Sequence, residues 1–119
     1  MTVLTQGIQT GEFLLSEAEG QRSREQVTVT VSGAVALPSG TVLGKITASG
    51  KYIKYSNVAA DGSQTAAAVL LNALPGTNGD YKAAVFVRDC EVSGAMLNGG
   101  SGVDAPGAVE LVAAGVIVR

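Results

Sequence analysis

The stretch from Ser39 to Leu71 constrains the fold of this chain more than any other part of the sequence. Two short segments with alternating apolar residues, Thr41 to Thr47 and Lys51 to Tyr55, are separated by a turn that contains a glycine. After a polar Asp-Gly loop, the sequence from Thr65 to Leu74 is almost continuously apolar. Alternation predicts half-buried strands, and the apolar run predicts a strand buried on both faces, although its alanines would equally tolerate a helix. The stretch is therefore typical of the edge of a small β-barrel.

Further strands are predicted on both sides of this stretch. Apolar and polar residues alternate strictly from Gln26 to Val31 and again from Tyr81 to Arg88. A period of two residues is the signature of a strand with one buried face. The wholly apolar segment from Val116 to Val118 predicts a closing strand. Prolines and glycines at Leu37 to Gly40 and at Pro75 to Asp80 predict the turns and loops between these strands.

One helix is predicted near the C-terminal end. Apolar residues recur at helical spacing from Ala108 to Val112, with Pro106 near the first turn. Asp104 can cap this helix and Gly115 can end it. The glycines between Gly94 and Gly102 predict a flexible surface excursion before the helix.

The N-terminal segment differs from the rest. Met1 to Gly11 is polar with few apolar residues, too little apolar area to fold alone, so we interpret it as an arm. After it, Ser16 could cap a brief helical turn that Gly20 ends. We expect residues 12–119 to form a single domain. The predicted fold class is α+β and β-dominated: a small barrel-like β-domain with a short C-terminal helix and an extended N-terminal arm.

Composition limits how the core can be built. The chain has 119 residues, of which 46% are hydrophobic, but aromatic residues make up only 4% and tryptophan is absent. Val, Leu, Ile and Ala must therefore fill the core with few large side chains. A core of that kind gains stability from oligomerisation.

Charge and cysteine content exclude several classes of function. The net charge is −2 and the eight Lys and Arg residues are scattered, so no basic stripe indicates nucleic acid as a partner. A single cysteine and the absence of histidine exclude a disulfide framework and the usual structural zinc sites. No segment approaches the roughly 18 apolar residues that a bilayer requires, and no signal peptide is recognisable. We expect no membrane partner and synthesis in the cytoplasm.

Little in the sequence indicates catalysis. Without histidine, the commonest base for a serine or cysteine nucleophile is missing. Cys90 is most simply a small half-buried residue after a strand. A Ser-Lys dyad remains formally possible, because Ser49 lies near Lys51 and Ser39 lies near Lys45. Both pairs flank turns, where serine and lysine are ordinary.

Metal, anion and cofactor sites are equally poorly supported. Four acidic residues lack calcium-loop spacing and are expected to be solvated: Asp80, Asp89, Glu91 and Asp104. The glycine-rich segment at Gly99 to Gly102 is not followed by the Gly-Lys-Ser/Thr of a phosphate loop. The lysines on the predicted hairpin lack the flanking residues of lipoyl or biotinyl carrier domains. We expect no metal, no cofactor and no catalytic residue.

The order of several short motifs resembles a known family. Val42 to Ile46 reads Val-Leu-Gly-Lys-Ile, and Ser49 to Tyr52 reads Ser-Gly-Lys-Tyr. An Asp-Gly pair then precedes the Ala/Val/Leu run. The resemblance also includes Ser23 to Val29 before this stretch and Leu111 to Val118 after it. In this order and spacing the sequence resembles the head decoration proteins of tailed bacteriophages, the lambda head protein D-like family.

The resemblance implies a structural role. Members of this family are compact mixed α/β trimers on the outer face of an expanded icosahedral head, at its threefold and quasi-threefold positions. The implied function is a capsid decoration or cement protein, whose partners are the major capsid protein and further copies of itself. The implied location is the outer surface of the virion capsid.

The arm is the expected contact with the coat. Spaced apolar residues suit strand addition, in which main-chain hydrogen bonds supply affinity and side chains set the register. The expected capsid-binding residues are Thr2, Val3, Leu4, Thr5, Gln6 and Ile8. Two other readings stay open at this point: a trimeric tail or fibre module that binds a receptor, and a small Ser-Lys hydrolase.

Overall fold

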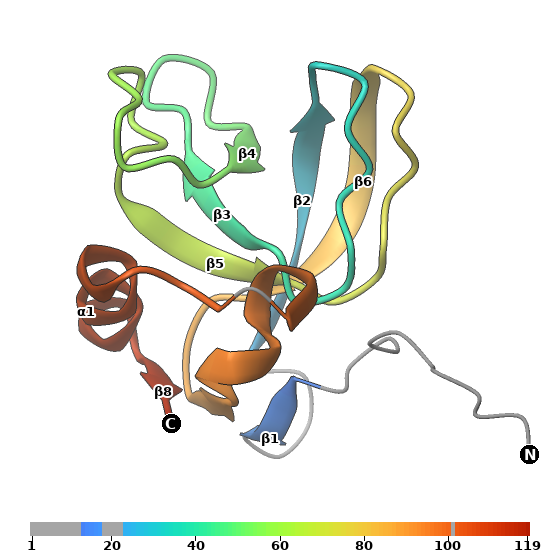
Figure 1. Cartoon of the computed structure of the whole chain (residues 1–119). Coiled ribbons are helices and arrows are strands. Elements are labelled where there is room, and N and C mark those ends of the chain that lie inside the picture. The colour runs from blue at the N-terminus through green and yellow to red at the C-terminus, as the bar shows by residue number, and fades with distance from the viewer. Residues whose placement is uncertain (1–12, 18–22, 101) are drawn as a thin grey trace, which may run out of the picture.

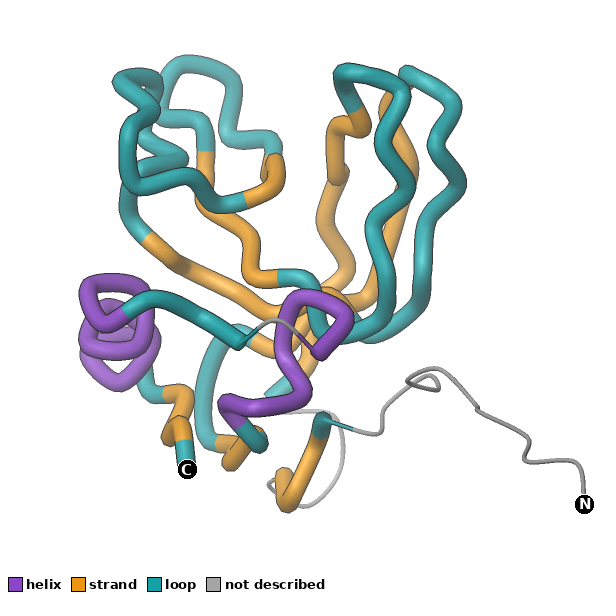
Figure 2. The backbone as a smooth tube through the Cα atoms, in the orientation of Figure 1, coloured by secondary structure: helices purple, strands orange, loops and turns teal. Residues whose placement is uncertain are grey.

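The computed structural model describes residues 13–17, 23–100 and 102–119 of the chain, which form eight strands and two helices (Figures 1 and 2). The elements in chain order are β1 (Leu14–Glu17), β2 (Arg24–Val31), β3 (Val42–Lys45), β4 (Tyr52–Lys54), β5 (Ala66–Leu70), β6 (Gly79–Phe86), β7 (Cys90–Val92), the 3-10 helix η1 (Gly94–Gly100), α1 (Ala105–Ala114) and β8 (Val116–Val118).

Five of the strands form a closed barrel in the order β2-β4-β3-β5-β6. Its longest ladder joins β2 to β6 in antiparallel register, from Arg24 opposite Phe86 to Val31 opposite Gly79. Its shortest ladder joins β2 to β4 in parallel, with Val29 opposite Tyr52. Beyond this junction the β3-β4 side and the β2-β6 side diverge towards the top of Figure 1. Barrel closure therefore depends on very few main-chain contacts along this seam.

A second sheet lies below the barrel and has the order β1-β7-β8. β1 is antiparallel to β7, and β8 is parallel to β7. Parallel neighbours need a crossover connection, and here η1 and α1 provide it between β7 and β8. Figure 2 shows these two helices beside the small sheet and beneath the barrel strands.

The core has two parts, one inside the barrel and one between the barrel and the small sheet. In the second part the buried rings of Phe13 and Phe86 meet edge to face, with centroids 5.8 Å apart. Gly40 makes room for this contact, since a Cβ atom there would lie 3.1 Å from the Phe13 ring. The φ angle of Gly40 is +87°, which also favours glycine. Phe13 thus fixes the small sheet to the barrel.

Most predicted elements are confirmed. The structure is β-dominated, with a barrel and one short C-terminal α-helix. The Ala-rich run forms strand β5 rather than a helix. Asp104 caps α1 by accepting a hydrogen bond from the Gly107 N–H at 2.8 Å, and Gly115 ends α1 with a φ angle of +104°.

Three local predictions are wrong. Ser16 lies in strand β1, not in a helical turn, because the main chain of Leu14–Glu17 pairs with β7. Gly20, the predicted end of that turn, lies outside the described residues. Cys90 follows strand β6 as predicted, but it is the first residue of β7 and is buried rather than half-buried. The predicted excursion from Gly94 contains η1, whose buried Leu97 packs in the core.

Removing the Phe13 ring should destabilise the fold strongly. Phe13→Ala deletes a fully buried aromatic side chain, so we expect the free energy of unfolding to fall by about 3–5 kcal/mol. The matched control is Leu15→Ala, two residues further along in β1, which removes a half-exposed side chain and should cost about 1 kcal/mol or less. Urea denaturation followed by circular dichroism measures both values. Equal losses in the two variants would show that Phe13 does not join the two layers.

Candidate functional site

The six residues expected to bind the capsid lie outside the described part of the chain: Thr2, Val3, Leu4, Thr5, Gln6 and Ile8. The structure places the point where the described chain begins. Phe13 and β1 enter the molecule at one edge of the small sheet, with β8 at the other edge.

β1 is fixed to β7 by main-chain and side-chain contacts. The Ser93 N–H donates a hydrogen bond of 2.7 Å to the Phe13 carbonyl, and Leu14 lies opposite Val92. The register then shifts between Leu14 and Ser16, as in a β-bulge. Sequence reasoning missed this pairing because β1 has only four residues and its partner lies far along the chain.

Glu91 on β7 connects both edges of the small sheet. Ser16 Oγ donates to Glu91 Oε2 at 2.7 Å, and Arg119 Nη2 donates to Glu91 Oε1 at 2.6 Å. The hydrogen bond from Ser16, followed by the Arg119 contact, lowers the pKa of Glu91 below its ordinary value. One carboxylate therefore links Ser16 in β1 to Arg119, which directly follows β8.

The N-terminal end of α1 is occupied by the chain's own groups. Asp104 accepts hydrogen bonds from Tyr55 Oη at 2.9 Å and from Asn57 Nδ2 at 3.0 Å, besides its cap to Gly107. Desolvation and the hydrogen bond to Asp104 raise the pKa of Tyr55 to about 12. The helix terminus thus already holds a carboxylate where an external anion would bind.

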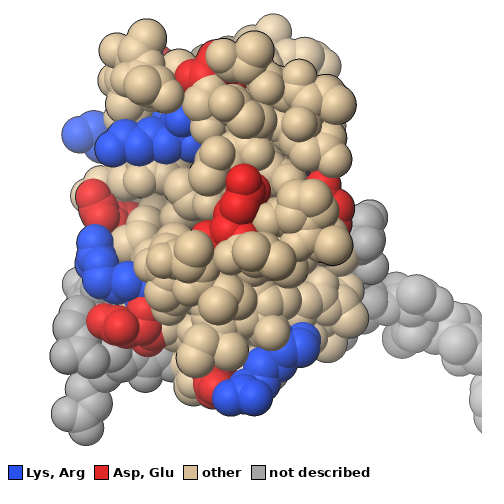
Figure 3. Space-filling model, turned by 90° about the vertical axis from the view of Figure 1, so that its left-hand side faces the viewer, with Lys and Arg blue, Asp and Glu red and all other residues tan. Residues whose placement is uncertain are grey.

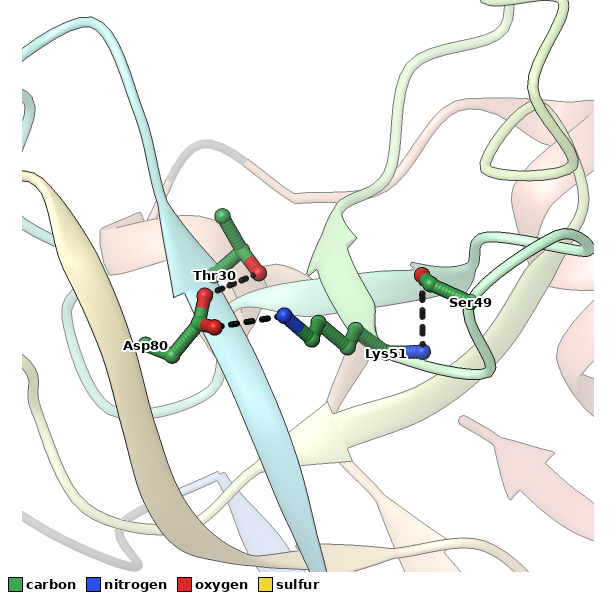
Figure 4. Close-up of polar contacts among 4 residues, drawn as sticks. All are labelled: Thr30, Ser49, Lys51 and Asp80. Carbon is green, nitrogen blue, oxygen red and sulfur yellow. Dashed lines mark hydrogen bonds and ion pairs between the residues drawn. The ribbon is translucent and has the colours of Figure 1, made fainter.

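The structure does not assemble the first candidate Ser-Lys dyad. Figure 4 shows the Lys51 side chain directed across β2 towards Asp80, away from Ser49. Lys51 Nζ lies 2.6 Å from Asp80 Oδ2, and Thr30 Oγ1 donates to Asp80 Oδ1 at 2.8 Å. Ser49 Oγ instead accepts the main-chain N–H of Lys51 at 3.3 Å. The hydrogen bonds from Lys51 and Thr30 lower the pKa of Asp80, and they connect Lys51, which directly precedes β4, to β6 and β2.

The second candidate dyad is not assembled either. Ser39 is buried, and its hydroxyl donates to the Leu71 carbonyl at 2.6 Å. The Lys45 ammonium lies over the Tyr52 ring, 6.0 Å from its centroid. In neither candidate dyad, therefore, does the serine hydroxyl contact the lysine ammonium.

The acidic residues considered earlier are dispersed. Asp80, Glu91 and Asp104 lie on different elements with different partners. Within the described ranges, no three His, Cys, Asp or Glu side chains come together. Neither of the described helices has the length and apolar character needed to cross a bilayer.

The link through Glu91 should make part of the stability depend on pH. A lowered pKa in the folded state means that the contribution is complete above the unfolded pKa of about 4.3 and is lost as the pH falls through the folded value. The difference in unfolding free energy between the wild type and Glu91→Gln should therefore be largest near neutral pH and shrink below about pH 4. Urea titrations at several pH values measure it. A difference that does not change with pH would contradict the assignment.

Comparison with known proteins supplies the identity that the site geometry alone does not. The sequence model of the family described as bacteriophage lambda head decoration protein D matches residues 3–115. No curated protein and no solved structure matched the chain. The match includes the N-terminal segment from Val3, the barrel, the small sheet up to β7 and the C-terminal helix. The chain belongs to the bacteriophage lambda head decoration protein D family.

Proposed function

We propose that this chain is a capsid cement that binds as homotrimers to the outer surface of an expanded phage head and stabilises it. The observation that carries the proposal is the family match over residues 3–115. The family is named for the head rather than the tail, which favours decoration over the tail or fibre alternative. Synthesis in the host cytoplasm and assembly onto the capsid follow from this function.

The chain is divided by role in this proposal. Residues 1–11 form a capsid-binding arm, and residues 12–119 form a single decoration domain. The arm adds a strand to segments of the major capsid protein through Thr2, Val3, Leu4, Thr5, Gln6 and Ile8. The position of β1 at an edge of the small sheet supports this division, because an arm that continues from an edge can leave the body without disturbing the barrel.

Binding and stabilisation follow from the same contacts. Val3, Leu4 and Ile8 cannot offset the entropy of ordering the arm by themselves. A coat strand edge supplies paired main-chain groups that favour the ordered arm. Because the protein binds the expanded lattice and not its dissociated subunits, it stabilises that lattice by mass action.

Deleting Met1 to Gly11 should separate folding from capsid binding. We expect the truncated protein to remain folded and to fail to coat expanded heads, because it lacks the strand that pairs with the coat. Cosedimentation with undecorated heads measures binding, and thermal disruption of the heads measures stabilisation. The matched control is Gln9→Asn in the full-length chain, which keeps the whole arm, lies outside its six expected contact residues and should bind as the wild type does.

If the truncated protein decorated and protected heads like the intact one, the arm would not be the anchor. The body of the domain would then have to hold the capsid.

The proposed role requires no catalysis, and we expect none. Ser49 should not react with a serine-directed covalent probe, because its neighbour Lys51 is paired with Asp80. Cys90→Ser should leave head binding unchanged, since the thiol is buried inside β7. Mass spectrometry after labelling and the same cosedimentation assay test both statements. Stoichiometric labelling, or loss of binding in a folded Cys90→Ser variant, would contradict them.

A further inference from the structure

The chain contains two Asn-Gly pairs, Asn78-Gly79 and Asn98-Gly99, and the fold places them in different surroundings. In such a pair the main-chain nitrogen of the glycine can attack the side-chain carbonyl carbon of the asparagine, because no Cβ atom obstructs the approach. The reaction converts asparagine to aspartate or isoaspartate. In a folded protein its rate depends on how firmly the amide group is held and on access to water.

The side-chain amide of Asn78 is held at one atom. Asn78 is exposed and lies in the connection between β5 and β6. Its Oδ1 accepts the Ala34 N–H at 2.7 Å. None of the described residues accepts a hydrogen bond from its Nδ2. The nitrogen that the reaction expels is therefore in contact with solvent and can leave as ammonia.

The Ala34 N–H favours the attack. When the glycine nitrogen bonds to Cγ of Asn78, negative charge develops on Oδ1. A main-chain N–H that already points at this oxygen stabilises the charge, as the donors of an oxyanion hole do. Ala34 has a φ angle of +53°, which is uncommon for a residue other than glycine. One contact therefore anchors the turn at Ala34 and activates the Asn78 amide.

The attacking nitrogen belongs to a residue at the end of a strand. Gly79 is the first residue of β6, and its partner Val31 is the last residue of β2. Strand ends open more readily than strand centres. Little surrounds Gly79, since a Cβ atom there would have its nearest contact with the Tyr81 ring at 3.9 Å. Opening of this last pair would free the nitrogen without disturbing the rest of the ladder.

The side-chain amide of Asn98 is held at both atoms. Its Oδ1 accepts the Val42 N–H at 2.9 Å, and its Nδ2 donates to the Gly102 carbonyl at 2.9 Å. Asn98 is half-buried, and Val42 is fully buried. Turning this amide towards the nitrogen of Gly99 would break both hydrogen bonds and leave a buried N–H without an acceptor. The fold therefore protects Asn98.

We propose that Asn78 is a site of spontaneous deamidation in the folded protein and that Asn98 is not. The Gly79 nitrogen loses its proton to water and bonds to Asn78 Cγ. The bond between Cγ and Nδ2 breaks, and Nδ2 takes up a proton and leaves as ammonia. The cyclic imide then adds one water molecule at either of its carbonyl carbons and opens to aspartate or isoaspartate.

Both products add a negative charge to a surface with few charges. Charged residues make up 15% of the chain, whereas about 25% is usual. Figure 3 shows broad uncharged areas between the charged groups on the side of the molecule that carries α1. Isoaspartate also lengthens the main chain by one methylene directly before β6, which displaces the acceptor of the Ala34 N–H. Deamidation would therefore weaken the contact between the β2-β3 and β5-β6 connections.

The test follows both asparagines in the wild-type chain. The full-length protein is aged in warm, mildly alkaline buffer in which it stays folded, and peptide mapping by mass spectrometry measures each site. We expect Asn78 to be converted roughly tenfold faster than Asn98 or more, because two hydrogen bonds must first break at Asn98. The matched control is the same chain unfolded in guanidinium, where the difference should disappear.

A pair of variants tests the assignment through the released ammonia. Asn78→Ser should abolish most of the ammonia release and the isoaspartate formed by the folded protein. Asn72→Ser changes an exposed asparagine of the same connection that is followed by alanine, and it should leave both unchanged. The comparison of Asn78 with Asn98 in the wild type does not depend on the folding of either variant.

Three results would overturn the inference. Equal or faster conversion of Asn98 in the folded protein would show that its hydrogen bonds do not protect it. Conversion of Asn78 only after unfolding would show that the fold protects this site as well. A difference that persists in guanidinium would show that the neighbouring sequence, not the fold, selects Asn78.

Discussion

The edge-to-face contact between Phe13 and Phe86 holds the two layers of this protein together. The chain has two phenylalanines and no tryptophan, and both Phe rings meet in this contact. Phe86 ends the long β2-β6 ladder, while Phe13 immediately precedes β1. An aromatic-poor core therefore places its largest apolar side chains where the barrel and the small sheet need a common anchor, and Gly40 leaves the space that the anchor requires.

The sequence predicted elements whose signals are local. Alternation identified β2 and β6, and the cap at Asp104 with the glycine at position 115 identified α1. The strands β1 and β7 have four and three residues, too few for a period to be visible. Their pairing depends on contacts such as that between Ser16 and Glu91, 75 residues apart. Only tertiary packing makes these segments strands, and propensity is a weak guide in such cases.

The helical period located α1 but not its buried side. Leu111 is buried as the spacing suggests, but Val112 is exposed and the Glu110 carboxylate faces inward. A helical pattern places charged side chains on the solvent side, because a carboxylate prefers water. Here the Ala66 N–H at the start of β5 needs an acceptor, and Glu110 supplies it, which turns the valines outward. The N-terminal residues could be assigned to the capsid only from their apolar spacing and the family resemblance, because strand addition is completed by a partner.

The arrangement of the small sheet suits the proposed function, in which a single arm would bind the capsid only weakly. Three short apolar side chains in one arm bury little area, so one copy alone would dissociate quickly. In the proposed homotrimer, three arms would reach one lattice, and each bound arm would hold the others at high effective concentration. Such avidity requires that each arm is firmly attached to the folded domain. Phe13 packs against Phe86 in the core, and Glu91 links Ser16 in β1 to Arg119, next to the other edge of the sheet. In the proposed function, a load on the arm would therefore pass into the body of the domain through one three-stranded sheet.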